Sequence, residues 1–190
     1  GLGAAGPLCL HAALMVIITG SPIPVQTHRS YFLYESSPWR NPTGVDGLNE
    51  PKGAYLFHIT FGRKGAFLMF PVLLTGVLGA AIAAIRRDTP LRGYILAGAA
   101  AFAILTAYYV KSTNNYGGGT YGFRWYLGAA PVLLLMGTPV YLRARRVWHW
   151  ALLAALLAVS MYSAWECHRL PWGDNLEWTC RWLFGPTYIG

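Results

Sequence analysis

The chain has 190 residues, of which 55% are hydrophobic and only 12% are charged. Soluble domains carry about 25% charged residues, so this composition argues against a soluble enzyme, a disordered tail and a nucleic-acid-binding protein. The net charge of +8 would suit a polyanionic partner on a soluble protein, but here basic residues are concentrated between apolar runs. These features predict an all-α, integral, multi-pass membrane protein.

Five apolar segments are long enough to cross a bilayer, which takes about 20 residues. In chain order they are residues 2–20, 66–85, 93–110, 126–142 and 147–165, and we expect them to form one helical bundle over residues 1–165. The fourth segment carries Pro131 and Pro139, so it is expected to be kinked and packed inside the bundle, where neighbouring helices satisfy the backbone groups that proline frees.

The second segment, residues 66–85, contains no charged residue and is the clearest of the five. Small residues recur on it at intervals of four, at Gly76, Ala80 and Ala84. A ridge of small residues lets two helices approach closely in a membrane. The spacing therefore predicts a helix-packing surface on this segment.

Short arginine-rich connections set the expected orientation. They join the second segment to the third and the fourth to the fifth, and contain Arg86, Arg87, Arg92, Arg143, Arg145 and Arg146. Both connections fall on the same side of a five-helix topology, which the positive-inside rule makes cytoplasmic. The N-terminus is then cytoplasmic as well, and residues 21–65, 111–125 and 166–190 form two external loops and an external tail.

The first of these loops is unusually long and ends in AYLFHITFGRKGAFLMFP, residues 54–71. We expect this stretch to contain short helices at the membrane interface and to turn at Gly65 into the second membrane segment. The loop also carries the acids Glu35, Asp46 and Glu50. They are predicted to be solvated loop charges.

The second loop reads KSTNNYGGGTYGFRWYLG, residues 111–128. Its three consecutive glycines, Gly117, Gly118 and Gly119, can adopt positive φ, and backbone N–H groups in such a turn can cradle an anion. Arg124 can pair with phosphate oxygens through two N–H groups. The alternative is a flexible loop in which Arg124 only extends to the membrane interface. No Lys-Ser/Thr pair follows the glycines, so this is not a P-loop.

The cysteines and the tail indicate little chemistry. Cys9 lies in the first segment, whereas Cys167 and Cys180 lie in the tail, where a disulfide between them is possible in an oxidising compartment. Glu166 is expected to pair with a neighbouring cation. The sequence has no CxxC, HExxH or comparable spacing, so neither a metal site nor a cofactor is predicted.

Two motifs resemble a known family. Tyr55-Leu-Phe-His58, followed by Phe61-Gly-Arg63-Lys-Gly65 and Pro71, is similar to the YLFHxxFGRxGxFxxxPxLL stretch of bacterial polytopic proteins related to the GT-C glycosyltransferases. Residues 116–126, leading to Pro131, resemble their WGGxSxGxRYLxPxxP segment, with Phe123 where a proline commonly precedes the arginine. The resemblance covers most of residues 1–135 and is specific in these two motifs.

The resemblance implies an enzyme of the bacterial cytoplasmic membrane that moves a sugar from a polyprenyl-phosphate carrier to an acceptor on the outer face. It places the carrier phosphate at Arg124, Gly117, Gly118, Gly119, Tyr121, His58 and Arg63. In such enzymes an Asp or Glu near the N-terminus activates the acceptor. We expect this chain to be the C-terminal part of a longer protein that carries that residue, so no catalytic residue is assigned here.

Two other functions fit an apolar bundle. A transporter or channel component would need ionisable residues inside its helices, and the second to fifth segments have none in their middle parts. A non-catalytic structural or assembly protein of the membrane would need no such residues. In each case the expected partner is membrane lipid and not nucleic acid.

Overall fold

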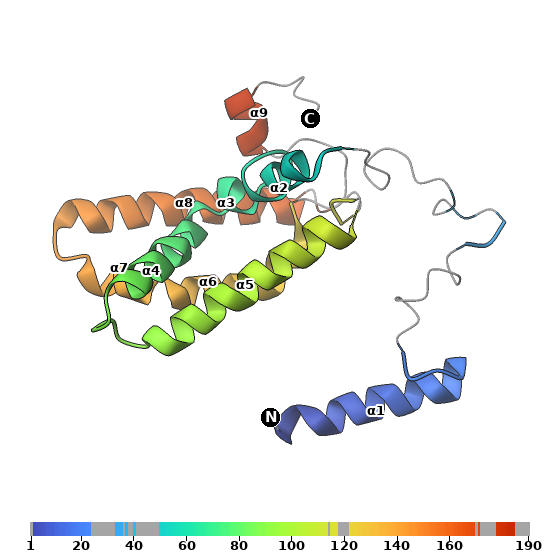
Figure 1. Cartoon of the computed structure of the whole chain (residues 1–190). Helices are drawn as coiled ribbons and strands as arrows, with labels where there is room; N and C mark the ends of the chain where they lie inside the picture. The colour runs from blue at the N-terminus through green and yellow to red at the C-terminus, as the bar shows by residue number, and fades with distance from the viewer. Residues whose placement is uncertain are drawn as a thin grey trace. The chain divides into compact units, whose positions relative to one another are not determined.

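The computed structural model describes residues 2–23, 33–35, 37, 40, 50–113, 115–117, 122–169, 171 and 178–184. The chain divides into two units, Gly1–Gly44 and Val45–Gly190. Every regular element among the described residues is a helix (Figure 1). The prediction of an all-α protein is therefore confirmed for that part of the chain.

The first unit contains one helix, α1 (Leu2–Thr19), which matches the first predicted segment. Its described apolar part, Ala5–Thr19, is shorter than a full membrane span. Large apolar side chains point outward along it, including Leu8 and Ile17. The helix is confirmed, and its crossing of a membrane stays a prediction.

Three apolar stretches of the second unit are long enough to span a bilayer. They are α5 (Arg92–Ser112), the run Arg124–Arg143, and α8 (Val147–Arg169). The run consists of η5 (Arg124–Ala129), α6 (Ala130–Met136) and α7 (Thr138–Arg143). These stretches correspond to the third, fourth and fifth predicted segments and support a multi-pass membrane protein. Five crossings and their orientation remain predictions.

The second predicted segment is not one continuous helix. It consists of α3 (Ala66–Met69), η4 (Pro71–Leu73) and α4 (Leu74–Ile85), with a break at Phe70. The break has a local cause, because the residue before a proline avoids the helical region, and Phe70 adopts φ −122° and ψ 67°. The part from Pro71 to Ile85 is about 22 Å long, which is less than the hydrocarbon thickness of about 30 Å.

The predicted kink in the fourth segment is confirmed. The helix is interrupted at Gly137, between α6 and α7. Pro139 has no N–H for the carbonyl of Leu135, and the hydroxyl of Thr138 donates to that carbonyl instead, over 2.6 Å. The interruption therefore leaves this backbone oxygen satisfied, and α6 packs against both α4 and α5 with one face, which buries Leu133 and Met136.

Helices α4 and α6 approach each other backbone to backbone. A Cβ added to Gly76 would lie 2.9 Å from the carbonyl carbon of Leu133, and one added to Gly79 would lie 2.8 Å from that of Met136. The predicted ridge is correct at Gly76 and in part at Ala80, which is half-buried and packs against the same cluster, but wrong at Ala84, which is exposed. The close approach continues at Gly79 instead, and Ala83 is the fully buried residue of the next turn. The reason is that the crossing angle of the two helices, and not the spacing of four alone, selects the buried residues.

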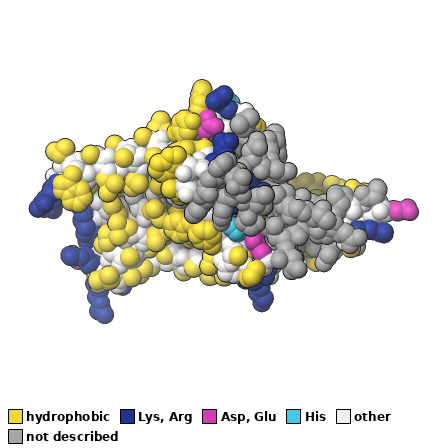
Figure 2. Space-filling view, turned by 90° about the horizontal axis from the view of Figure 1, so that it is seen from above, with side chains coloured by type: hydrophobic (Ala, Val, Ile, Leu, Met, Phe, Trp, Pro, Cys, Tyr) yellow, Lys and Arg dark blue, Asp and Glu magenta, His cyan; other side chains and the backbone are white. Residues whose placement is uncertain are grey.

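The two ends of the second unit differ in character. At one end lie the connections between α4 and α5 and between α7 and α8, and Figure 2 shows Lys and Arg side chains protruding there beyond the hydrophobic surface of the helices. We call this the arginine-rich end; it contains Arg86, Arg87, Arg92, Arg143, Arg145 and Arg146. At the other end lie α2 (Lys52–Thr60), α3, the described part of the loop after α5, and α9 (Trp178–Phe184).

Candidate functional site

The predicted site residues that the structure describes, His58, Arg63, Gly117 and Arg124, lie at the end opposite the arginine-rich end. Helix α2 is held there on the last turn of α5. The Lys52 ammonium donates to the carbonyl of Thr113 over 3.1 Å, and the Tyr55 hydroxyl lies 2.7 Å from the Thr113 hydroxyl. Tyr55 also donates to the carbonyl of Asn115 over 2.8 Å. These bonds join the loop before the second segment to the loop after α5.

The turn from α2 into α3 lies at the predicted place. Gly65 is the N-cap of α3, and its N–H donates to the carbonyl of Gly62 over 2.9 Å. A Cβ on Gly65 would lie 2.6 Å from the carbonyl carbon of Phe61. Only glycine therefore fits this corner, which brings the α2 residues back over the end of the helices.

Aromatic rings join the two sequence motifs. Tyr55 of the first motif stacks on Tyr116 of the second, with centroids 5.3 Å apart and planes within 5°. Phe123 meets Tyr55 edge-on at 6.5 Å, and the His58 ring lies 6.0 Å from Tyr116. All four side chains are buried. The motifs are about sixty residues apart in the chain but form one hydrophobic floor.

Glu50 is part of this site, although the sequence predicted a solvated loop charge. Its carboxylate accepts a hydrogen bond from the buried hydroxyl of Tyr116. Burial raises the pKa of Tyr116 well above its usual value, and the hydrogen bond to Glu50 and its negative charge raise it further. Tyr116 therefore stays protonated and acts as a donor. Of the other two acids, Glu35 is exposed as predicted, and Asp46 lies outside the described residues.

His58 is held as a neutral side chain. Its ring is 5% exposed, and burial lowers its pKa, with the positive charge of Arg63 acting in the same direction and Glu50 in the opposite one. The backbone N–H of Arg63 points to Nδ1 of His58 at 3.3 Å. His58 therefore fixes the turn that carries Arg63, and the half-buried Arg63 side chain lies close enough to Tyr116 for its charge to oppose the rise in the tyrosine's pKa.

Gly117 and Arg124, both of the second motif, lie in contact. Gly117 has φ +90°, and a Cβ there would lie 3.3 Å from Cγ and 3.4 Å from Nε of Arg124. The Gly117 N–H donates to Oδ1 of Asn115 over 2.8 Å. Gly117 therefore shapes the turn and gives the arginine side chain its path, while the side chain of Arg124 remains exposed. Gly118, Gly119 and Tyr121 lie outside the described residues.

The resulting site combines positive charge with a hydrophobic floor. Arg63 and Arg124 come from different motifs; the charge of Arg63 acts on the buried Tyr116, and Arg124 lies against Gly117, the next residue in the chain. Within the part of the chain that the structure describes, no group of three or more His, Cys, Asp or Glu side chains could hold a metal ion. Arginine side chains beside an apolar surface at a helix end are suited to a phosphate group that is attached to a lipid tail.

The expected pairing of Glu166 is confirmed in α8. Arg169, one turn later, places Nη1 3.5 Å from Oε1 of Glu166. Cys167, next to it, forms no disulfide with a described residue, and the side chain of Cys180 lies outside the described residues. The disulfide between these two cysteines stays a prediction.

Glu50 and its contact with Tyr116 were not recognised from the sequence. A weak signal existed, because Glu50 directly precedes Pro51, the N-cap of α2, and acidic residues are favoured near helix N-termini.

No protein-family model, curated protein or solved structure matches the chain, so no known family can be assigned from this geometry. The resemblance to the GT-C glycosyltransferases rests on the two motifs.

Proposed function

We propose that this chain is the carrier-binding part of an integral membrane glycosyltransferase, which moves a sugar from a polyprenyl-phosphate carrier to an acceptor at the membrane surface. The observation that carries the proposal is the contact between Arg124 and the Gly117 turn beside Tyr116. Tyr116, the residue before Gly117, joins this turn to the first motif, because it lies beside His58 and within reach of the charge of Arg63.

The position of Arg124 suits a phosphate at the level of the lipid headgroups. The residue begins the apolar run Arg124–Arg143, so its guanidinium lies where a membrane helix ends. A lipid phosphate there would have its polyprenyl tail beside the helices and its charge against Arg124 and Arg63. Fixed cations of this kind stabilise the negative charge that develops on the phosphate as the sugar leaves.

An arginine that only extends to the interface would need none of the surrounding architecture. Here the aliphatic part of the Arg124 side chain packs against Gly117, a buried glycine with positive φ. Tyr116, the residue before Gly117, is held by its hydrogen bond to Glu50 and by stacking on Tyr55. A pre-formed position lowers the entropy that the side chain loses when it binds. In the proposal the arginine-rich end faces the cytoplasm of a bacterial cell, and this site faces outward.

The first test is binding of decaprenyl phosphate to the purified chain in detergent micelles. We expect Arg124→Ala to weaken binding by about tenfold to a hundredfold, the loss typical of a hydrogen-bonded charged group. Arg124→Lys should also lose affinity, because an ammonium cannot replace the two-pronged contact. Arg181→Ala is the matched control, because Arg181 is an exposed cation of α9 at the same end.

Equal binding by the wild type and Arg124→Ala would refute the phosphate role. A second measurement separates an enzyme from a non-catalytic lipid-binding protein: transfer of a radiolabelled sugar from a polyprenyl-phosphate donor by membranes that contain the protein. Transfer that falls in Arg124→Ala but not in Arg181→Ala supports the proposal. Carrier binding without transfer would favour the non-catalytic alternative when the membranes also supply the acceptor-activating acid, which the proposal does not place in this chain.

A further inference from the structure

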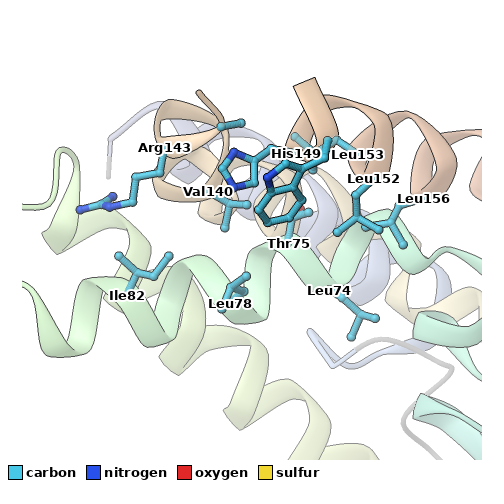
Figure 3. A pocket seen from close by; sticks show the side chains of 12 residues that line it. Leu74, Thr75, Leu78, Ile82, Val140, Arg143, His149, Leu152, Leu153 and Leu156 are labelled. Carbon is cyan, nitrogen blue, oxygen red and sulfur yellow. The ribbon is translucent and has the colours of Figure 1, made fainter. Parts of the chain in front are cut away.

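A separate groove lies between α4, α7 and α8, toward the arginine-rich end. It has a volume of about 420 Å³, within the range of about 300–1,000 Å³ that is usual for small-molecule sites. Figure 3 shows side chains of α4 and α8 facing the same space, and most of them are apolar: Leu74, Leu78, Ile82, Leu152, Leu153 and Leu156.

The groove results from the way α7 and α8 are attached to neighbouring segments. The hydroxyl of Ser160 in α8 accepts the N–H of Val72 over 3.2 Å, which ties α8 to η4. Tyr141 of α7 is tied to Thr75 of α4 by a hydroxyl–hydroxyl bond of 2.7 Å. The leucines between these two attachments line an open groove instead of a closed core.

One end of the groove is positively charged. Arg143 lies at the end nearest Ile82 (Figure 3), and its Nη1 donates to the carbonyl of Pro139 over 3.1 Å. This bond uses one of the five N–H groups of the guanidinium, which extends outward from this end of the groove (Figure 3). Six arginines and one acid, Asp88, occupy residues 86–92 and 143–146, so an anionic ligand is favoured there.

Two aromatic side chains complete the same end. Trp148 and His149 both line the groove, and their ring centroids lie 3.8 Å apart. Nδ1 of His149 accepts the N–H of Arg146 over 3.2 Å, which orients the imidazole. Tryptophan is enriched at the level of lipid headgroups, so these rings indicate the depth at which a headgroup would lie.

We propose that this groove binds an anionic glycerophospholipid, with an acyl chain along the leucines and the headgroup phosphate against Arg143. Basic pockets between membrane helices are suited to anionic headgroups, and the apolar lining matches a hydrocarbon chain. An apolar helix of another copy is less suited, because its side chains would bury Arg143 without a counter-charge. The site is independent of the carrier-binding site at the other end.

The test measures lipid retained by the full chain. The protein is reconstituted into vesicles of equimolar phosphatidylglycerol and phosphatidylcholine, extracted in mild detergent and weighed by native mass spectrometry. Arg143→Gln should lower the ratio of bound phosphatidylglycerol to phosphatidylcholine about fivefold, the loss expected for one arginine near an anionic surface. Arg145→Gln, an exposed arginine of the same connection that does not line the groove, should leave the ratio unchanged.

A second pair of variants tests the apolar part. Leu78→Trp fills the groove and should reduce retention of both lipids, whereas Leu135→Trp places the same bulk on an exposed position of α6 outside the groove. Equal effects of Arg143→Gln and Arg145→Gln would overturn the proposal in favour of a diffuse surface charge. Unchanged lipid retention by Leu78→Trp would overturn the proposal as well. So would a wild-type protein that is a dimer without bound lipid and that Leu78→Trp converts to a monomer.

Discussion

The contact between α4 and α6 gives the sharpest prediction about stability. Gly79→Ala adds one methyl group at the closest approach of the two helices. That methyl carbon would stand 2.8 Å from the carbonyl carbon of Met136 and 3.2 Å from Cα of Gly137. Both neighbours are backbone atoms, so no side-chain rotation relieves the contact. The helices must separate, and the centre of the unit loosens with them.

The magnitude follows from these distances. Ordinary van der Waals contact begins near 3.4 Å, so the carbonyl carbon of Met136 must move by at least 0.6 Å, the difference between 3.4 and 2.8 Å, and its carbonyl oxygen, which is nearer still, by more. Overpacking of this kind costs about 1–3 kcal/mol, while alanine regains up to about 1 kcal/mol of helix propensity over glycine. We expect Gly79→Ala to lower the free energy of unfolding by about 1–2 kcal/mol.

Gly93→Ala is the matched control, because a Cβ on Gly93 of α5 meets nothing within 4 Å. This variant should be as stable as the wild type or up to about 1 kcal/mol more stable. Unfolding of both variants in mixed micelles, titrated with SDS and followed by tryptophan fluorescence, measures the difference. If Gly79→Ala unfolds at the same SDS fraction as Gly93→Ala or a higher one, the close approach of α4 and α6 is wrong.

Two further predictions concern the site at the opposite end. Tyr116→Phe removes the hydrogen-bond donor to the half-buried Glu50 and should lower the free energy of unfolding by about 1 kcal/mol. Tyr94→Phe, at an exposed tyrosine, is the control and should leave the free energy of unfolding unchanged. Equal melting temperatures of the two variants would contradict the contact between Tyr116 and Glu50. Burial lowers the pKa of His58 below 6.5, so the unfolded chain binds more protons, and stability should fall as the pH drops through about 6.5. His58→Asn keeps an acceptor for the Arg63 N–H but does not titrate. The difference in unfolding free energy between wild type and variant should therefore change as the pH falls below about 6.5. A difference that stays constant with pH would show that His58 is not buried as described.

Local features of the sequence were enough to locate most helices. The third, fourth and fifth predicted segments correspond to α5, to Arg124–Arg143 and to α8, because a long run without charge is recognisable without its neighbours. Pro139 predicted the interruption near Gly137 for a similar reason, since a missing N–H acts on its own helix. A second local effect of proline, which keeps the preceding residue out of the helical region, would have predicted the break at Phe70 before Pro71.

The candidate site depends partly on local sequence motifs and partly on tertiary contacts. The motifs predicted that Gly117 and Arg124 belong together and that His58 and Arg63 lie nearby, since these residues are close in the chain or share a motif. They did not predict Glu50, because its partner Tyr116 is 66 residues away and reaches it only after α2 docks on the end of α5.

The sequence by itself determined where apolar helices form, where they break and where the arginines lie between them, since each of these depends on residues within one or two turns. Tertiary structure alone decided that the contact with α6 at Gly76 continues at Gly79, and that Ala83 and not Ala84 is buried. It also decided that α8 leaves a groove beside α4. Both outcomes depend on crossing angles and attachment points between helices, which are set by many side chains from distant parts of the chain and not by any spacing within one segment.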